Sequence, residues 1–321
     1  MERILAMLSM HDCMTGEAMS REMGITRAAV WKKIEILRAE GWNIESLGRK
    51  GYRLHAGDRL DPVLWQGGLR TQALGRGNVF YAEVMDSTND QLRLMAAGGA
   101  PHGSLCLCEQ QTGGKGRLGR QWVSRSGEGL WQSVLLRPAL SPQSAPLITL
   151  AVALSMAQAL ENVGLFGVRI KWPNDLVING RKVCGILCEA SADMDRIASV
   201  ICGVGLNVKE GAVPDELRHQ ATSLETEGLH VLRRRILTMY LERLESNMKV
   251  LEKDGFAALL EGYTARSCTL GSRVHVVGSK DFLGMAEALD TDGALLVRDD
   301  AGFLQKVLAG DVSVRGVMGY V

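Results

Sequence analysis

A run of four glycines and three basic residues in the middle of the chain carries the strongest chemical signal in the sequence. It extends from Gly113 to Arg120 (GGKGRLGR) and contains no acidic residue. Glycine lets backbone N–H groups approach a ligand closely, and lysine and arginine supply charge for phosphate or carboxylate oxygens. The spacing matches neither the P-loop nor the dinucleotide-binding fingerprint. We therefore expect a loop that closes over an anion, the alternative being a flexible basic surface loop.

Three further polar segments lie on either side of this loop. They are Ser87 to Asn89 (STN), Lys171 to Asp175 (KWPND) followed by Arg181 to Leu187 (RKVCGIL), and Gly203 to Asn207 (GVGLN). Hydroxyl and amide groups at a strand-to-helix corner can bind a polar ring, and proline restricts the backbone that presents Asn174 and Asp175. Two alternatives stay open: Ser87 with Asp90 three residues later also fits a helix capping box, and the Pro-Asn-Asp stretch fits an ordinary turn.

Composition limits the class of protein that these segments can belong to. The 321 residues are 46% hydrophobic and 23% charged, with 37 basic and 36 acidic residues, which predicts a folded protein of about two or three domains. With a net charge of +1, any binding of nucleic acid has to be local. The longest apolar run, Leu147 to Leu160, is shorter than the roughly 20 residues of a membrane span, so we predict a buried helix. With no secretory signal visible at the N-terminus, a cytoplasmic protein without a membrane partner is expected.

The seven cysteines show no C-x-x-C pair and no metal-ligand spacing. Free cysteine behaves as a small buried apolar residue. We predict reduced thiols in the core and no metal site built from protein side chains.

The first 55 residues have the pattern of a winged helix-turn-helix. Helices are expected over 2–10, 15–23 and about 26–38, with Thr26 as an N-cap, and a β-hairpin wing over 42–54. From Arg27 to Arg53 seven basic residues face three acidic ones, and phosphate contacts need such a patch. We predict DNA contacts from Arg27, Lys32, Lys33, Arg49 and Lys50. The alternative is a winged unit used for protein contacts or dimerisation.

The remainder of the chain divides into two units after a linker that ends at Asp61-Pro62. Residues 62–267 mix strands and helices without strict alternation, which predicts an α+β sheet covered on one face by helices. Residues 270–321 show short alternating runs separated by Asp-Gly and Ala-Gly turns, which predicts a small β-barrel. The fold class is thus multidomain α+β.

In their order along the chain, the four polar segments closely resemble those of the bacterial biotin protein ligases. With the winged helix they resemble the subgroup that also represses biotin synthesis genes, and the likeness spans essentially the whole chain. The resemblance implies that biotin and Mg²⁺-ATP form biotinyl-5′-adenylate, and that biotin then passes to a lysine of a biotin carboxyl carrier protein domain. It also implies an SH3-like C-terminal domain, operator DNA as a partner, and a homodimer.

The resemblance assigns roles to individual residues. Arg117, Lys182 and Lys115 are the candidate catalytic cations. Biotin contacts are expected from Ser87, Thr88, Asn89, Gln111, Lys115, Gly116, Arg117, Lys182 and Gly185, and nucleotide contacts from Asn174, Asp175 and Asn207. The commonest loop of the family reads Gly-Arg-Gly-Arg, and Lys115 departs from it. Because lysine lacks the planar fork of arginine, Arg117 is the stronger expectation.

An acyl adenylate is already activated, so no enzyme nucleophile is expected. Residues 110–127 and 211–224 are predicted to order over the ligands. Two alternatives remain: a ligand-responsive transcription factor without catalysis, and a relative of the lipoate or octanoate ligases.

Overall fold

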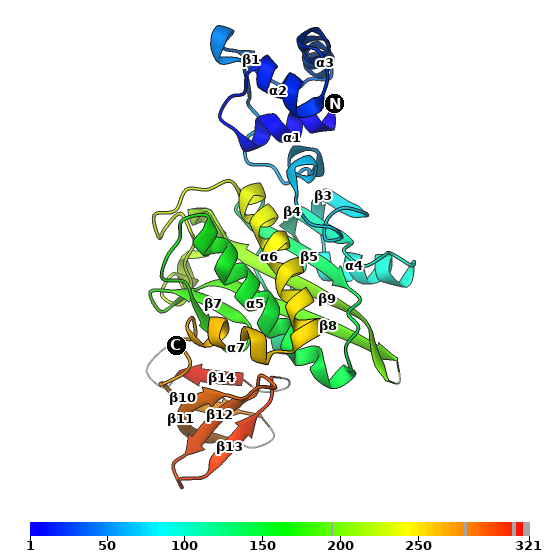
Figure 1. The fold of residues 1–321 in the computed structure, drawn as a ribbon. Coiled ribbons are helices and arrows are strands. Elements are labelled where there is room, and N and C mark those ends of the chain that lie inside the picture. Colours follow the sequence, from blue (N-terminus) through cyan, green and yellow to red (C-terminus); the bar gives the residue numbers. More distant parts are fainter. Residues whose placement is uncertain (194, 279–280, 310–312, 317–321) are drawn as a thin grey trace.

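The computed structural model describes residues 1–193, 195–278, 281–309 and 313–316, the last four by their backbone only. Residues 279–280, 310–312 and 317–321 of the predicted C-terminal domain lie outside the described residues. Three units follow one another from the N-terminal end of the molecule to the C-terminal end (Figure 1).

The N-terminal unit packs three helices against a two-stranded wing. Its elements are α1 (Glu2–Met10), α2 (Gly16–Met23), α3 (Arg27–Ala39), β1 (Ile44–Ser46) and β2 (Tyr52–Leu54). Thr15 and Thr26 cap α2 and α3 by accepting from Ala18 N and Ala29 N. Gly24 ends α2 with a φ of 66°, a left-handed conformation that favours glycine. The predicted Thr26 cap and the hairpin are therefore present.

The central unit is a seven-stranded sheet in the order β3-β4-β5-β9-β8-β7-β6, in which only β3 and β4 are parallel. The strands are β3 (Val79–Met85), β4 (Leu105–Gln111), β5 (Gly129–Leu136), β6 (Arg169–Lys171), β7 (Asp175–Ile178), β8 (Arg181–Asp193) and β9 (Arg196–Asn207). The helices are α4 (Thr88–Ala97), α5 (Ala145–Asn162), α6 (Arg233–Asp254) and α7 (Ala257–Thr264). Short 3-10 turns are η1 (Gly48–Lys50), η2 (Pro62–Leu64), η3 (Gln66–Gly68), η4 (Arg117–Gly119), η5 (Pro142–Ser144), η6 (Glu210–Ala212) and η7 (Asp215–Leu217).

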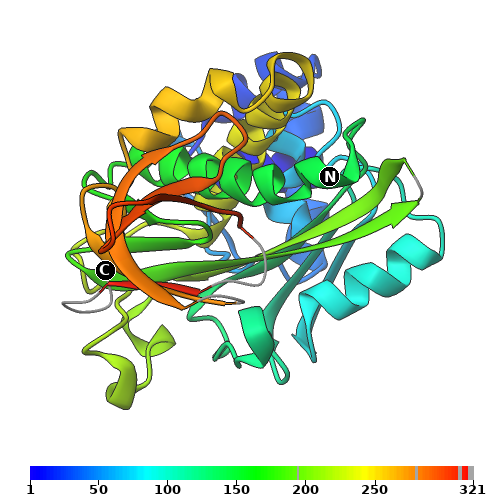
Figure 2. The same cartoon turned by 90° about the horizontal axis from the view of Figure 1, so that it is seen from below.

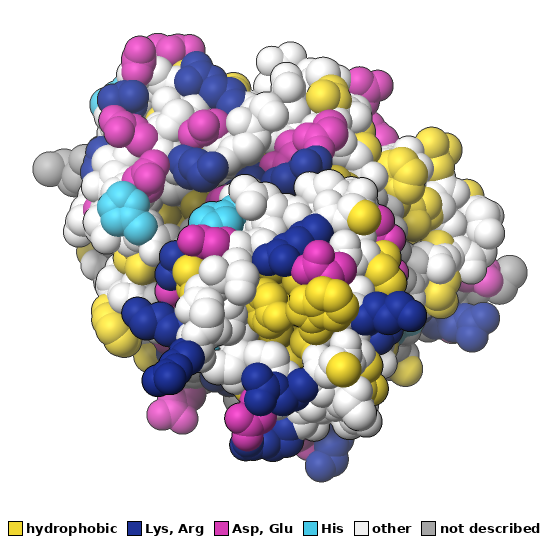
Figure 3. Space-filling model, turned by 90° about the horizontal axis from the view of Figure 1, so that it is seen from above, with side chains coloured by type: hydrophobic (Ala, Val, Ile, Leu, Met, Phe, Trp, Pro, Cys, Tyr) yellow, Lys and Arg dark blue, Asp and Glu magenta, His cyan; other side chains and the backbone are white. Residues whose placement is uncertain are grey.

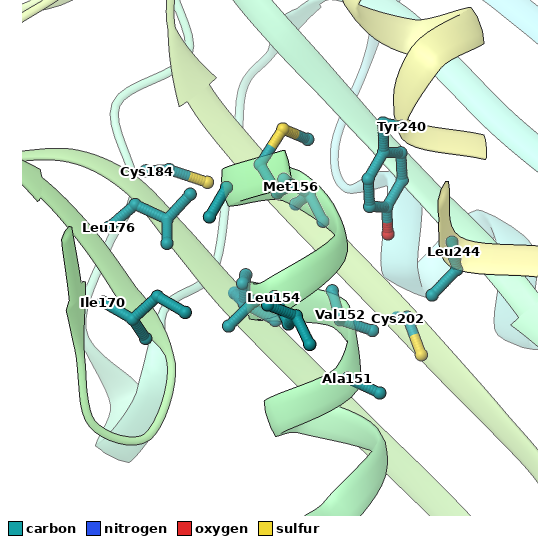
Figure 4. Packing of buried hydrophobic residues seen from close by; sticks show 14 of the residues in the cluster. Ala151, Val152, Leu154, Met156, Ile170, Leu176, Cys184, Cys202, Tyr240 and Leu244 are labelled. Carbon is teal, nitrogen blue, oxygen red and sulfur yellow. The ribbon is translucent and has the colours of Figure 1, made fainter. Parts of the chain in front are cut away.

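Helices α5 and α6 cover one face of this sheet, as predicted, and α4 lies against the opposite face (Figure 2). The apolar segment predicted as a buried helix is α5. This helix is long and apolar enough to cross a membrane, but its side chains fill the core between the sheet and α6. Figure 4 shows Val152, Leu154 and Met156 of α5 among side chains of the strands, with Tyr240 and Leu244 of α6 beside them. Each such side chain contributes about 1.5–3 kcal/mol when fully buried.

The C-terminal unit is a five-stranded antiparallel sheet in the order β13-β12-β11-β10-β14. Its strands are β10 (Arg273–Val277), β11 (Phe282–Leu289), β12 (Leu295–Asp299), β13 (Leu304–Val307) and β14 (Ser313–Gly316). Within the part of the chain that the structure describes, β13 and β14 are the two edges and no pairing joins them. The antiparallel β-unit is confirmed, and closure into an SH3-like barrel is not.

Candidate active site

A small cavity of about 50 Å³ lies above the glycine-rich strands β8 and β9. Gly185 and Gly205 are directly opposite each other in the two strands. A Cβ atom on Gly205 would lie 2.4 Å from Nε1 of Trp122, and one on Gly185 would lie 2.8 Å from Cζ3 of the same ring. A Cβ on Gly203 would lie 2.2 Å from Oδ1 of Asn89. Glycine is thus required along this floor because other groups approach the strands closely.

The polar wall of the cavity comes from the start of α4, where the three predicted side chains are buried. Gln111 Oε1 accepts from the backbone N (2.9 Å) and the hydroxyl (3.1 Å) of Thr88. Ser133 Oγ lies 2.7 Å from Thr88 Oγ1 and 2.6 Å from Asn89 Oδ1. Ser87 accepts from Asp90 N as the N-cap of α4. The cap is therefore present, and the same segment lines the cavity.

Two of the three predicted catalytic cations converge on the start of β7. Arg117 Nη1 donates to Asn174 Oδ1 at 3.0 Å. Lys182 Nζ lies 2.6 Å from Asp175 Oδ1 and 5.3 Å from the centre of the Trp122 ring. Segments far apart in the sequence thus bring two cations to one edge of the cavity, which suits the binding of anionic groups.

Lys115 takes a different direction. Its Nζ lies 2.6 Å from Asp90 Oδ2 on α4, and Asp90 also pairs with Arg93. The two basic neighbours lower the pKa of Asp90 against the opposing effect of burial. Lys115 thus pairs the glycine-rich loop with α4, and the same residue also lines the smaller cavity. Gly116 lines both this cavity and the next.

A second, larger cavity of about 810 Å³ continues from the first and is lined by the loop, by the KWPND segment and by residues 212–221. Its volume lies within the roughly 300–1,000 Å³ of ordinary ligand pockets. Asn207 borders it and donates to Thr222 O at 3.0 Å. Lys182 N donates to Gln220 O and Lys182 O accepts from Thr222 N, both at 2.8 Å, so the segment predicted to order over the ligands is joined to β8.

Lys171 lines the second cavity and is 8% exposed. Burial lowers the pKa of its ammonium to about 8, against an opposing effect of Asp175. Positive charge on the nearby Lys182 and Arg120 acts in the same direction as burial. This cation is therefore poised to respond to a bound anion.

Carboxylates are few around the two cavities. Among the described residues no group of three or more His, Cys, Asp or Glu side chains is placed to hold a metal ion. Asp175 is the carboxylate that lines the larger cavity, and it is paired with Lys182. A magnesium ion at this site would therefore depend mostly on phosphate oxygens, with Asp175 as one protein oxygen within the cavity.

At the N-terminal end of the molecule, Lys and Arg side chains lie around a small hydrophobic patch (Figure 3). Two of the seven basic residues of this region brace the wing: Arg38 donates to Ile44 O at 2.7 and 2.8 Å, and Arg53 pairs with Asp12 at 2.8 Å. The five predicted DNA contacts, Arg27, Lys32, Lys33, Arg49 and Lys50, lie on α3 and at the wing tip, and all except the half-buried Lys33 are exposed. Trp31 of α3 is also 56% exposed.

Several residues of the site escaped prediction. They are Trp122, Ser124, Ser133 and Lys171, together with Gly203 and Gly205 as floor positions. The alternating glycines of GVGLN carried a usable signal, because residues two apart in a strand share a face. Ser133 lies in a strand that otherwise reads as core, so no sequence signal was available for it.

Each of the three units matches a known protein family. Residues 81–207 match the Biotin/lipoate A/B protein ligase family, residues 1–53 an HTH domain, and residues 269–315 the Biotin protein ligase C terminal domain. The fold and the site thus define a ligase of the biotin/lipoate class that carries a DNA-binding domain.

The relatives narrow this class. The chain is 34% identical to the bifunctional ligase/repressor BirA of Bacillus subtilis, over 95% of this chain and 94% of that protein. It is 30% identical to the protein of the same name from Escherichia coli, over 98% and 96% of the two chains. The structure of a biotin protein ligase from Aquifex aeolicus in complex with biotin and ATP matches with a TM-score of 0.66 at 30% identity, covering 75% of this chain and 99% of that one. The chain belongs to the family of bifunctional biotin protein ligase/repressors, which confirms the resemblance.

Proposed function

We propose that the protein forms biotinyl-5′-adenylate from biotin and ATP, transfers biotin to a lysine of a biotin carboxyl carrier protein domain, and represses biotin synthesis genes. The observation that carries the proposal is the convergence of Arg117 and Lys182 at the junction of two connected cavities. The smaller cavity has a glycine floor and polar groups suited to a ring amide. The larger one is of nucleotide size.

In the first step a carboxylate oxygen of biotin attacks the α-phosphorus of ATP. The new O–P bond forms as the bond to the β-phosphate breaks, and pyrophosphate leaves. Both reactants are anions, so the step needs positive charge and alignment. We assign this charge to Arg117 and Lys182, while Asn174 holds the Arg117 guanidinium in place. A magnesium ion would supply further charge on the phosphate oxygens.

In the second step the neutral amine of the acceptor lysine attacks the carbonyl carbon of the adenylate. The C–O bond to phosphate breaks, AMP leaves, and the amine releases one proton to solvent water. Asp175 lies beside Lys182 at the edge of this site, and we propose that its carboxylate positions the incoming amine. No enzyme nucleophile is required, because the mixed anhydride is already activated.

For biotin to reach its place, the loop has to shift. The smaller cavity of about 50 Å³ is far below the roughly 300–1,000 Å³ of ordinary ligand pockets, so a bicyclic ligand does not fit without a change in the loop. Trp122 lies directly over Gly205, so the indole blocks the floor. We propose that biotin displaces this ring outward and that the loop then closes over the adenylate.

The regulatory half of the proposal rests on the winged unit, whose exposed cations follow α3 and the wing tip. We propose that these residues contact operator phosphates, and that Asn174, Asp175 and Asn207 bind the nucleotide. We further propose a homodimer that presents two winged units to a symmetric operator. We propose magnesium as the metal and a cytoplasmic location for the protein. The C-terminal unit is proposed to close into an SH3-like barrel, and the domain limits are proposed at 1–55, 62–267 and 270–321.

A single incubation tests the catalytic half. Purified protein, biotin, Mg²⁺-ATP and an acceptor carrier domain are combined, and the mass of the acceptor is measured. Wild type is expected to add one biotin to the acceptor, and Arg117→Ala is expected to slow this transfer and release adenylate into solution. Wild-type protein that is folded but produces neither pyrophosphate nor adenylate would refute the ligase proposal and leave a ligand-binding repressor. Lipoate in place of biotin tests the second ligase class, and we expect no transfer.

A further inference from the structure

Two arginines at the start of α6 are buried where charge is costly. Arg233 is 1% and Arg234 4% exposed. Positive charge in the first turn of a helix opposes the helix dipole, and a buried cation needs partners to offset its lost hydration. Both arginines find their partners in other parts of the chain.

Arg233 holds the linker against the catalytic sheet. Its guanidinium lies 3.0 Å from Asp58 Oδ2 and 2.7 Å from Glu109 Oε2, and it donates to Gly129 O at 3.0 Å. In return Asp58 Oδ1 accepts from the backbone N of Arg233 at 2.8 Å. The N-cap residue Leu232 offers no side-chain acceptor, so a linker carboxylate caps α6.

Arg234 extends from the same helix turn to the N-terminal unit. It donates to Ser9 O at 3.0 and 3.3 Å and to Gly57 O at 2.7 Å. Ser9 lies in the last turn of α1, where carbonyl groups have no partner within the helix. This turn contains no basic residue of its own. Arg234 therefore supplies the cation that the C-terminal end of α1 favours.

The remaining contact between the two units is close but largely apolar. Helix α1 lies on η2 and η3, where a Cβ atom on Gly67 would be 3.0 Å from Ala6 Cβ. The hydroxyl of Ser9 also bonds to Leu64 O. Apolar packing has little directionality, whereas the planar guanidinium of Arg234 accepts only a narrow range of geometries.

The joint formed by Arg233, Arg234 and the linker also contacts the ends of both ligand loops. Gly129, which binds Arg233, begins β5 directly after the glycine-rich loop and is paired with Asn207 of β9. Immediately beyond, Lys209 N donates to Glu128 O at 2.7 Å, and Lys209 Nζ lies 3.9 Å from Asp58 Oδ2. The linker carboxylate is thus shared between α6 and the segment that leads to residues 211–224.

We propose that Arg234 is a positioning residue that sets the orientation of the DNA-binding domain relative to the catalytic domain. Arg233, on the same helix turn, connects this contact to the ends of the two ligand loops. The inference rests on the proposed function and adds to it the contact through which ligand binding alters DNA binding. Arg234 touches neither ligand cavity, so its removal separates this role from catalysis.

Hydrogen exchange of the full-length protein tests the joint directly. Arg234→Met is expected to raise exchange about tenfold or more in peptides covering residues 5–14 and 55–64, because the cap on α1 is lost. Arg234→Lys keeps the charge but not the fork, and an intermediate rise is expected. Arg235→Met changes the exposed neighbour on the same turn and is expected to behave as wild type. Biotin transfer should remain within about twofold of wild type in all three variants.

Ligands provide the second readout. In wild type, biotin with Mg²⁺-ATP is expected to slow exchange in the same two peptides, and in Arg234→Met this response should be lost. Affinity for a duplex selected by the wild-type protein from a random pool should fall about tenfold in Arg234→Met. Unchanged exchange in both peptides for Arg234→Met, or a ligand response that persists in it, would overturn the proposal. If Arg234→Met unfolds globally, Arg234→Lys decides by the same local criterion. A wild type that selects no duplex refutes the repressor proposal alone, because the exchange measurements need no DNA.

Discussion

At the scale of single residues, the cations and polar side chains of the ligand site already have partners inside the protein. Arg117 donates to Asn174, Lys182 pairs with Asp175, and Gln111 accepts from Thr88. Ligand binding at this site therefore exchanges existing polar contacts for new ones, and each exchange contributes only a modest net free energy. The advantage is that the groups are held near their working positions before the ligand arrives.

Lys115 and Arg117 are expected to differ in importance despite their proximity. The Lys115–Asp90 pair is half-exposed, and such pairs contribute about 0–1 kcal/mol. Lys115→Ala should therefore raise the KM for biotin less than about fivefold, whereas Arg117→Ala should lower adenylate formation about tenfold or more. Pyrophosphate release measures both variants, with Lys115→Arg as the control. Equal losses in the two alanine variants would contradict this order.

Lys171 leads to a prediction about protons. With a pKa of about 8, the Lys171 side chain is a neutral amine in roughly half of the molecules at pH 8. A bound triphosphate favours the charged form and raises this pKa, so nucleotide binding should take up about half a proton at pH 8 and close to none at pH 6, where Lys171 is already charged. Binding enthalpies in buffers of different ionisation enthalpy measure the uptake. Lys171→Met should abolish it, and uptake that persists in that variant would assign the proton elsewhere.

At the scale of elements, β8 and β9 carry the site because antiparallel pairing places their glycines opposite each other. Gly185 faces Gly205 and Leu187 faces Gly203 in the register. Two strands thus leave a bare stretch of backbone on one face, and α4 and the loop supply the polar groups above it. Substrate space is created by missing side chains in these strands.

A methyl group on this floor should interfere with biotin. Gly205→Ala would add a methyl group to the floor that biotin is proposed to cover once the Trp122 ring has moved, and overpacking of such a close contact costs about 1–3 kcal/mol. We expect calorimetry to show a similar loss in biotin binding with little change in the rest of the fold. Gly77→Ala, where nothing lies within 4 Å of the added atom, is the matched control. Wild-type affinity in Gly205→Ala would mean that biotin binds elsewhere.

Helix α3 presents two kinds of exposed side chain, and they should act differently on DNA. Lys32 contributes charge, so Lys32→Ala should reduce the slope of log affinity against log salt by about one for each winged unit that binds. Trp31 is 56% exposed and uncharged, so Trp31→Ala should weaken binding to the selected duplex without changing that slope. Fluorescence anisotropy across a salt series separates the two effects. A slope change with Trp31→Ala, or none with Lys32→Ala, would argue against α3 lying along the DNA.

At the scale of the whole molecule, the central domain connects the other two through a few buried contacts. Arg234 reaches α1, while Trp172 of the KWPND segment donates its indole N–H to Gly293 O of the C-terminal unit at 3.1 Å. Trp172 lines the larger cavity and so joins the ligand site directly to the C-terminal unit, whereas Arg234 reaches the N-terminal unit from outside both cavities. Ligand-dependent motion in the centre has a physical route to either end.

The two ligand loops should respond together. Both segments, 110–127 and 211–224, contribute residues to the lining of the larger cavity, and Arg125 Nη1 donates to Gly211 O at 3.0 Å. With biotin and ATP we expect slower hydrogen exchange in both segments, and with biotin alone chiefly in the first. Exchange that stays unchanged in both segments would contradict closure.

The sequence alone determined the order of the units, the main helices and most strands, because amphipathic period, caps and turn residues are local signals. Hydrophobic run length predicted α5, and Thr26 predicted the start of α3. It also determined the family, because four short motifs occur in a characteristic order. Short β7, which follows the Pro-Asn turn, was not anticipated, since it has no strong local pattern. The helix after Ser87 was expected from its capping pattern, but its place on the second face of the sheet was not, because that depends on contacts between elements.

Tertiary structure alone decided how those residues meet. That Lys115 turns to Asp90 while Arg117 turns to Asn174 depends on the path of the loop, and neither partner is near in sequence. Ser133, Trp122 and Lys171 joined the site only through strand register and burial. The Arg234 cap on Ser9 links residues 225 positions apart. Local periodicity encodes which elements form, but the direction of a side chain and the burial of a charge depend on contacts between elements, which only the folded chain brings together.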